Sequence, residues 1–366
     1  MSADGAASAD PAAGPRVDPA GGRRADTAAG PSRAPAGVGL SGIGGPLVDV
    51  ATLAALLGIT VGDRQREGRP APARVQVLDV RWTLGGPPGF DGFRAGHIPG
   101  ARYADLETVF ARPPAAPVDG RGRHPLPEPA DLVADLADLG ITGDVPVVLV
   151  DAGSAMAAAR AWWVLRWAGV PAGSVAVLDG GQAAWEAAGL PVETGAGGGP
   201  TATAGHDDDA AAPRRTGRPA GWSLDLGGGH LPTVDADGAA VAGRVGVLLD
   251  ARSPERWRGD VEPVDPRRGH VPGARNLPWD GDLGPDGRWL SAAALADRLR
   301  SAGLGGTGAG AGQASAQGSG VVSCGSGVSA AHLVLAAAVA GLPLPALYPG
   351  SFSGWVADPS RPVETA

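Results

Sequence analysis

Short apolar runs alternate along this chain with segments whose apolar residues recur at helical spacing. Runs rich in β-branched residues predict buried strands, and the helical spacing predicts amphipathic or buried helices. The predicted strands are 75–80, 145–150, 174–178 and 321–323, and the predicted helices are 48–57, 130–139, 155–168 and 330–340. Strands that alternate with helices of this length are typical of βαβ units, so we predict an α/β fold built on parallel sheets flanked by helices.

The whole pattern occurs twice in the chain. The matching landmarks are Asp79 and Asp250, GHIPGA at 96–101 and GHVPGA at 269–274, and Trp185 and Trp355, at offsets of 171, 173 and 170 residues. Landmarks that repeat in one order at a nearly constant offset indicate a duplicated domain.

Length and local composition divide the chain into four parts. The 366 residues exceed what one hydrophobic core usually holds. Residues 1–44 are mostly Ala, Gly, Pro, Asp and Arg without a continuous apolar run, which predicts a flexible tail and no signal peptide. A second stretch of similar composition, 193–222, predicts a linker. The predicted domains are therefore 45–192 and 223–366.

Charge and composition exclude several classes of function. The chain has 38 acidic and 30 basic residues and a net charge of -8, which argues against nucleic-acid partners and an anionic membrane surface. The longest apolar helix is shorter than the roughly 20 residues that span a bilayer. One cysteine cannot form an intramolecular disulfide, so we expect a cytoplasmic protein. The cysteine and six scattered histidines lack metal-ligand spacing, so no metal or cofactor is predicted.

The only cysteine, Cys324, lies between a predicted strand and a predicted helix. It follows strand 321–323, and Gly325 and Gly327 allow a tight turn before helix 330–340. The N-terminus of a helix favours a thiolate, which is the nucleophilic form of cysteine. A cysteine that closes an apolar strand can also be a small buried hydrophobe. The glycine-rich loop favours the nucleophile.

The duplication places Asp151 at the position that corresponds to Cys324, 173 residues earlier. Only the second half therefore has a nucleophile. We expect one active site per chain, in the second half and facing the first, which acts as support or substrate wall.

These features together resemble the two-domain rhodanese family of sulfurtransferases, over about residues 45–366. The resemblance rests on the tandem repeat, the Asp-x-Arg after the first strand of each half, the GHxPGA motif and a cysteine loop in the second copy alone. The loop Cys-Gly-Ser-Gly-Val-Ser at 324–329 resembles that of 3-mercaptopyruvate sulfurtransferases, whereas thiosulfate-using rhodaneses usually carry positive charges there. A neutral loop suits a monoanionic keto acid.

The resemblance implies a reaction in two steps. Cys324 attacks the thiol sulfur of 3-mercaptopyruvate, a small-molecule donor, which leaves a persulfide on the enzyme and releases pyruvate. A thiol acceptor such as thioredoxin or a small thiol, or cyanide, then removes the outer sulfur. Such covalent catalysis splits one difficult transfer into two easier ones.

The resemblance also implies roles for particular residues. A proton relay would consist of a loop serine, a histidine and an acid from the first half, where this chain has glutamate in place of aspartate: Ser326, His124 and Glu107. Two arginines would bind the carboxylate and keto oxygen of the donor, and the loop would cradle the persulfide with its backbone amides. These substrate-binding residues are Arg256, Arg267, Gly325, Gly327, Val328 and Ser329.

Several alternatives compete with this interpretation. The same nucleophile could serve a thiosulfate sulfurtransferase, and a non-catalytic persulfide carrier or binding module could dock a partner through the half that contains Asp151. A phosphatase of the Cys-x5-Arg type is excluded because residue 330 is alanine. Arg258 and Arg268 lie close enough to compete for the substrate-binding roles. Gly354 stands where the family often has glutamate, which implies a changed pocket wall.

Residues that both halves share are assigned to the fold rather than to chemistry. These are His97 and His270, and the pairs Asp79–Arg81 and Asp250–Arg252, which we expect to be structural.

Overall fold

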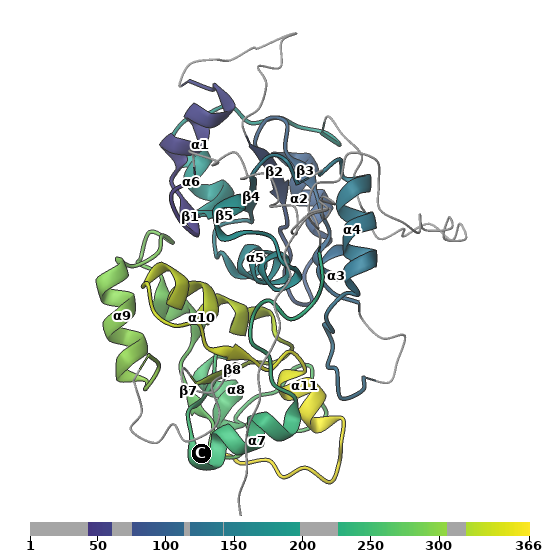
Figure 1. Ribbon diagram of the computed structural model, residues 1–366, viewed down its shortest axis with the longest axis vertical. Coiled ribbons are helices and arrows are strands. Elements are labelled where there is room, and N and C mark those ends of the chain that lie inside the picture. The colour runs from purple at the N-terminus through teal and green to yellow at the C-terminus, as the bar shows by residue number, and fades with distance from the viewer. Residues whose placement is uncertain (1–42, 61–74, 113–117, 142, 198–225, 306–319) are drawn as a thin grey trace, which may run out of the picture. The chain divides into compact units, whose positions relative to one another are not determined.

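A computed structural model describes residues 43–60, 75–112, 118–141, 143–197, 226–305 and 320–366 (Figure 1). The predicted tail, up to residue 42, and the predicted linker, from residue 198 on, lie outside the described residues.

The first half contains a five-stranded parallel sheet in the order β1-β5-β4-β2-β3. Its strands are β1 (Leu47–Val48), β2 (Gln76–Asp79), β3 (Arg102–Tyr103), β4 (Val147–Val150) and β5 (Val175–Leu178). Its helices are α1 (Val50–Leu57), α2 (Gly89–Ala95), α3 (Leu106–Val109), α4 (Pro129–Asp138), α5 (Met156–Ala168) and α6 (Gly181–Ala187). All four residues of β4 are buried, as expected for a central parallel strand covered on both faces.

The second half repeats this plan with a four-stranded parallel sheet in the order β7-β6-β8-β9. Its strands are β6 (Leu248–Asp250), β7 (Arg275–Asn276), β8 (Val321–Ser323) and β9 (Ala346–Leu347). Its helices are α7 (Ala236–Val245), α8 (Pro254–Arg258), α9 (Ala292–Ser301), α10 (Val328–Val339) and α11 (Ser351–Val356). The prediction of a duplicated α/β fold is confirmed, and the predicted elements lie within about two residues of the observed ones.

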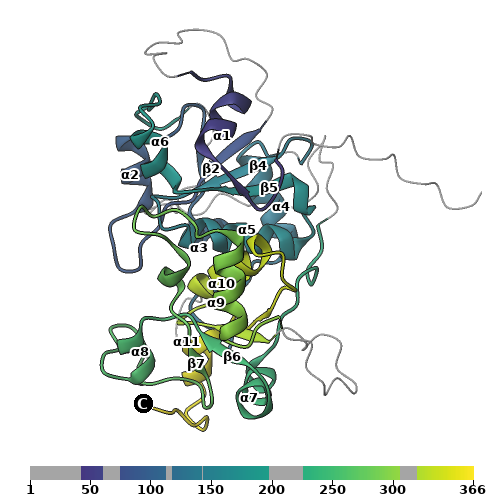
Figure 2. The same ribbon diagram turned by 90° about the vertical axis from the view of Figure 1, so that its left-hand side faces the viewer.

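Helices α5 and α10 lie side by side and form the main contact between the two halves (Figures 1 and 2). Almost every residue of α5 is buried, as are Val328 and most of α10. A helix that is apolar on all sides must be covered on all sides, here by its own sheet and by the partner helix. One apolar cluster consequently extends from Leu149 through Trp163 to Leu333. This shared core anchors α10 immediately after the cysteine loop.

The paired histidines hold the fold in both halves, as predicted. His97 Nδ1 lies 2.9 Å from the carbonyl oxygen of Phe93, and the two rings stack at 3.9 Å. His270 Nδ1 lies 2.7 Å from the carbonyl oxygen of Trp257, and these rings stack at 4.4 Å. Each histidine therefore ties the GHxPGA turn to the preceding helix.

The expected structural ion pairs are also present. The guanidinium of Arg81 binds the carboxylate of Asp79, and that of Arg252 binds Asp250 at 2.7 Å. Arg252 also lies over the ring of Phe352, 4.2 Å from its centroid. Both predicted ion pairs are therefore formed.

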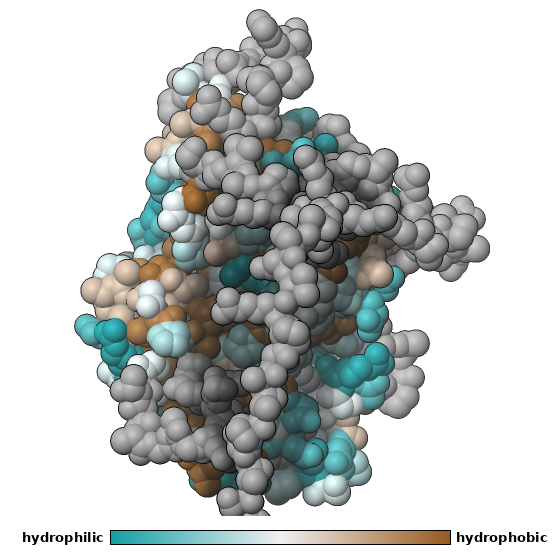
Figure 3. Space-filling view, viewed as in Figure 1, coloured by the Kyte–Doolittle hydropathy of each residue, from teal (hydrophilic) through white to brown (hydrophobic). Residues whose placement is uncertain are grey.

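The visible surface is mixed in character. The coloured part of the face in Figure 3 contains both hydrophobic and hydrophilic residues. In the part of the chain that the structure describes, no helix is long and apolar enough to cross a bilayer.

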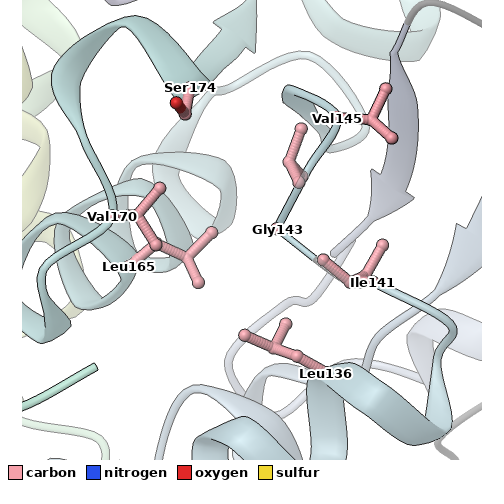
Figure 4. A pocket seen from close by; sticks show the side chains of 8 residues that line it. Leu136, Ile141, Gly143, Val145, Leu165, Val170 and Ser174 are labelled. Carbon is pink, nitrogen blue, oxygen red and sulfur yellow. The ribbon is translucent and has the colours of Figure 1, made fainter. Parts of the chain in front are cut away.

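A small apolar pocket lies within the first half (Figure 4). Its lining residues are Leu136, Ile141, Gly143, Val145, Val147, Leu165, Val170 and Ser174. Val147 and Ser174 lie at or just before the amino ends of β4 and β5. In parallel α/β sheets, ligands bind beyond the carboxyl ends of the strands, so we look for the site there.

Candidate active site

The cysteine loop holds the sulfur of Cys324 beneath the N-terminus of α10. Cys324 directly follows β8 and is 2% exposed. The amide of Gly327 donates to Sγ at 3.1 Å. Gly327 has φ +81°, and a Cβ there would lie 2.7 Å from the carbonyl oxygen of Pro349, so only glycine fits. A backbone donor at a helix N-terminus stabilises negative charge on this sulfur.

The corresponding loop of the first half has the same construction, but a carboxylate occupies it. Asp151 accepts hydrogen bonds from the amides of Gly153 at 2.9 Å, Ala155 at 3.0 Å and Ala158 at 3.4 Å. Ala155 has a left-handed φ of 57°, and Gly327 at the corresponding position of the second half is also left-handed, with φ 81°. Burial raises the pKa of Asp151, while the three amides oppose that rise. Both loops therefore direct backbone amides at the residue that begins them, which is a carboxyl group in the first half and a sulfur in the second.

Ser351, at the start of α11, also contacts Cys324. This residue was not predicted from the sequence. Its backbone is left-handed, with φ 49°, which strains a residue that has a Cβ. Its Oγ accepts from the amide of Cys324 at 3.1 Å, donates to the carbonyl of Tyr348 at 2.9 Å and lies 3.9 Å from Sγ. The corresponding first residue of α6 is Gly181, with φ 57°. A serine where the repeat has glycine was the available signal.

Close backbone contacts bring a loop of the first half, residues 119–124, to the site. A Cβ on Gly354 would lie 2.5 Å from the carbonyl oxygen of Gly120, and a Cβ on Gly122 would collide with Gly350. The amide of Arg123 donates to Ser353 Oγ at 3.1 Å. The glycine at position 354, noted in the sequence as a departure from the family, thus makes room for this loop.

Ser326, His124 and Glu107 form one hydrogen-bonded chain across the two halves. Ser326 Oγ lies 2.7 Å from His124 Nδ1, and His124 Nε2 lies 3.0 Å from Glu107 Oε1. Trp82, which was missed from the sequence, donates to Glu107 at 3.2 Å and meets the His124 ring edge-on at 5.3 Å. The structure therefore brings the three predicted residues together, and the longer side chain of glutamate reaches the histidine.

The protonation states of this chain follow from its surroundings. Burial lowers the pKa of His124, the bond to Glu107 opposes this, and nearby Arg160 and Arg123 lower it further. The bond from His124 lowers the pKa of Glu107, against partial burial. At neutral pH the carboxylate is ionised and the imidazole is neutral. Because an ionised carboxylate only accepts, Nε2 carries the proton and Nδ1 accepts from the hydroxyl of Ser326.

Of the two predicted substrate-binding arginines, the structure places Arg256 at the cysteine loop. Its Nη1 lies 3.5 Å from the point where a Cβ on Gly325 would be. Arg267 instead donates to the carbonyl of Arg361 at 2.7 Å and so holds the C-terminal segment. Beside Arg256 stands Arg123, whose Nη2 lies 3.1 Å from the same point.

Val328 and Ser329, also predicted to bind substrate, are the first two residues of α10. The side chain of Val328 is buried in the shared core. These two positions can therefore serve the site mainly through their backbone.

A buried cation, Arg160 on α5, lies behind the loop and was also missed. It is 0% exposed and donates to the carbonyls of His124 at 2.9 Å, Phe110 at 3.3 Å and Gly327 at 3.4 Å. Burial lowers the pKa of Arg160 to about 10, and attraction to Cys324 opposes this. An arginine in the middle of an apolar stretch, between Ala159 and Ala161, was the available signal.

Known proteins resemble this chain over most of its length. The Rhodanese-like domain matches residues 64–188 and again 236–358. SseB of Mycobacterium tuberculosis, provisionally named a thiosulfate sulfurtransferase, is 43% identical over 289 residues, which cover 79% of this chain and 90% of that protein. A Pseudomonas aeruginosa protein, named a probable 3-mercaptopyruvate sulfurtransferase, is 40% identical over 307 residues, covering 82% and 96%.

The fold agrees with a solved structure from the same group. The crystal structure of SseA from Escherichia coli, a 3-mercaptopyruvate sulfotransferase, is 26% identical with a TM-score of 0.62, covering 84% of this chain and 99% of that one. Two matched domains and these relatives show that the chain belongs to the rhodanese family. It is a two-domain sulfurtransferase.

Proposed function

We propose that this enzyme takes sulfur from 3-mercaptopyruvate, holds it as a persulfide on Cys324 and transfers it to a thiol or to cyanide. The observation that supports this donor is the neutral loop at 325–329, whose hydroxyl at Ser326 is joined to His124. A keto-acid donor needs proton transfer during sulfur release, and this hydroxyl lies two residues from the nucleophile.

The first step moves the sulfur of the donor to Cys324. The thiolate of Cys324 attacks the thiol sulfur, an S–S bond forms, and the C–S bond of the donor breaks. The bonding electrons stay on the donor carbon and give the enolate of pyruvate. Neutral His124 accepts the thiol proton through Ser326 and returns it to the enolate, which yields pyruvate. The amide of Gly327 and the cation of Arg160 stabilise the charge on sulfur.

The acceptor and the setting are part of the same proposal. Attack by an acceptor thiolate on the outer sulfur restores Cys324, as in any thiol exchange. Thioredoxin or a small thiol would serve, and a reducing compartment such as the cytoplasm keeps both thiols reduced. The boundaries 45–192 and 223–366 remain a prediction for the supporting and the catalytic domain.

A second candidate is thiosulfate, which the name of the Mycobacterium tuberculosis relative favours. Its outer sulfur would move to Cys324 and sulfite would leave without needing a proton. Steady-state kcat/KM for the two donors, followed by pyruvate and sulfite release, decides between them. We expect the larger value for 3-mercaptopyruvate, and a larger value for thiosulfate would overturn the donor assignment.

Ser326→Ala should separate the two donors. Because only the keto-acid reaction needs a proton returned, we expect kcat for 3-mercaptopyruvate to fall about 10- to 50-fold, at the lower end of general acid–base effects. Thiosulfate turnover should change less than about threefold. The measurement is thiocyanate formation from both donors in the presence of cyanide. An equal loss with both donors would contradict a role in proton transfer.

The pH profile should report the neutral histidine. The lowered pKa of His124 means that it stays unprotonated down to a pH below the ordinary histidine value of about 6.5. We expect kcat for 3-mercaptopyruvate to be flat between pH 7 and 8 and to fall only below about pH 6.5, as protonation removes the acceptor for Ser326. A kcat that rises on acidification through pH 6.5 would show that the imidazolium is the active form.

A further inference from the structure

We propose that Arg123, supplied by the first half, joins Arg256 of the second half to bind the anionic end of the sulfur donor. This rests on the proposed function for the identity of the donor. It makes Arg123 a specificity-determining residue.

The two guanidinium groups converge next to the nucleophile. Arg123 Nη2 lies 3.1 Å, and Arg256 Nη1 3.5 Å, from the point where a Cβ on Gly325 would be. The backbone of Gly325 is not left-handed, so its conformation would admit other residues. Glycine at position 325 instead leaves room, because any side chain would fill the space between the two guanidinium groups. A donor whose sulfur reaches Cys324 would put its anionic end in that space.

Each arginine is held on one side and open on the other. Nη1 of Arg123 binds Asp265, while Nε and Nη2 of Arg256 bind Glu262 at 3.2 Å and 2.6 Å. Among the described residues, no hydrogen-bond acceptor is found for Arg123 Nη2 or Arg256 Nη1. The carboxylates therefore orient the two forks and leave one N–H edge of each for a ligand.

The low solvent exposure of the two arginines strengthens the hydrogen bonds that their open N–H edges can donate. The side chains of Arg123 and Arg256 are 15% and 16% exposed, so a small solute can reach them while bulk water is mostly excluded. Ionic hydrogen bonds in such a setting are stronger than at a fully exposed surface.

The charges of the site are balanced before the donor arrives. Asp265 is 3% exposed and also lies 3.5 Å from Arg256, so it is shared between the two cations. The side chain of Glu262 is buried and is shared between Arg256 and Arg252, and Arg252 is also paired with Asp250. Three cations opposed by three carboxylates favour a ligand with one negative charge over a dianion.

Arg123 also couples recognition to the relay. It is adjacent to His124 on the loop 119–124, which contacts the second half through Gly122 and Gly354. The binding group and the proton acceptor therefore reach Cys324 together.

The test compares two donors that differ only in the carboxylate. Mercaptoacetone has the thiol and ketone of 3-mercaptopyruvate but no charge. For Arg123→Met we expect kcat/KM with 3-mercaptopyruvate to fall about 10- to 100-fold, mainly through KM, as expected for loss of a charged hydrogen bond. With mercaptoacetone it should stay within about twofold. Thiocyanate formed in the presence of cyanide is the common readout.

Two further variants sharpen the comparison. Arg121→Met removes the same charge from the same loop, but that side chain is 69% exposed and paired with Asp119, so neither donor should be affected. Arg123→Lys keeps the charge without the fork and should give an intermediate KM for 3-mercaptopyruvate.

Two results would overturn the inference. Arg123→Met could weaken both donors equally, which would make Arg123 a structural residue, or it could leave 3-mercaptopyruvate unaffected. Failure of the proposed function looks different, since the wild-type enzyme would then release no pyruvate. In that case thiosulfate is the probe, and an unchanged KM for thiosulfate in Arg123→Met would reject the inference as well.

Discussion

Cys324→Ser should lower sulfur transfer from 3-mercaptopyruvate and from thiosulfate by at least about 10⁴-fold. In the proposed mechanism the persulfide forms on this sulfur, and a serine hydroxyl is neither ionised at neutral pH nor able to carry sulfane sulfur. Cys324 is the only cysteine, so no other thiol can replace it. The measurement is thiocyanate formation, together with mass spectrometry of the protein after incubation with the donor.

The same variant contains its own control for folding. Serine is close in size to cysteine, and its oxygen can accept the hydrogen bond that Gly327 donates to Sγ. We therefore expect a thermal unfolding midpoint within a few degrees of wild type. A variant that folds normally and keeps a tenth of the activity would show that sulfur is transferred without a Cys324 persulfide.

Arg160→Met should give the second-largest effect, because it removes the buried cation behind the loop. Loss of a preorganised electrostatic contact commonly costs about 10²- to 10³-fold in rate, and we expect that loss for persulfide formation with either donor. The carbonyls of His124, Phe110 and Gly327 would also lose their donor. We expect the free energy of unfolding to fall by about 3 kcal/mol. Stopped-flow persulfide formation and urea unfolding measure the two effects.

Arg166→Met is the matched control on the same helix. Arg166 is half-buried in the last turn of α5, where it bonds the carbonyl of Val170, away from the cysteine loop. We expect it to lower stability without slowing persulfide formation. If Arg160→Met slowed the chemistry no more than Arg166→Met does, Arg160 would have only a packing role.

The fold was predictable because its signals are local and occur twice. β4 and β8 are short runs of buried apolar residues, and the two GHxPGA turns mark corresponding positions in the halves. The proposed nucleophile, Cys324, could be singled out for the same reason, because the corresponding position of the first half holds Asp151. The relay was found through resemblance, and the structure then brought its members within hydrogen-bonding distance.

The remaining site residues depend on contacts between distant segments. Arg123 and Arg160 reach the loop from the first half, and no periodicity in the sequence relates them to Cys324. Ser351 was missed because its role lies in a strained backbone. Arg267 was predicted to bind substrate from its place in 260–268. The residues of this stretch are exposed or part-buried without a repeating pattern, so the sequence does not show which of its arginines points to the site.

The two corresponding loops differ in what their backbone amides bind. In the first loop the amides always bind the side chain of Asp151, and in the second the amide of Gly327 binds the sulfur of Cys324. The first loop is complete as soon as the chain folds, because the acceptor of its amides, the carboxyl group of Asp151, belongs to the chain. The second loop holds the sulfur of Cys324 with the Gly327 amide, and in the proposed cycle a second, transferable sulfur is added to it. By thermodynamic linkage, a group that favours the folded state adds to its stability. In the proposed cycle, sulfur loading is therefore coupled to the folding equilibrium of both halves together, because they share one core through α5 and α10.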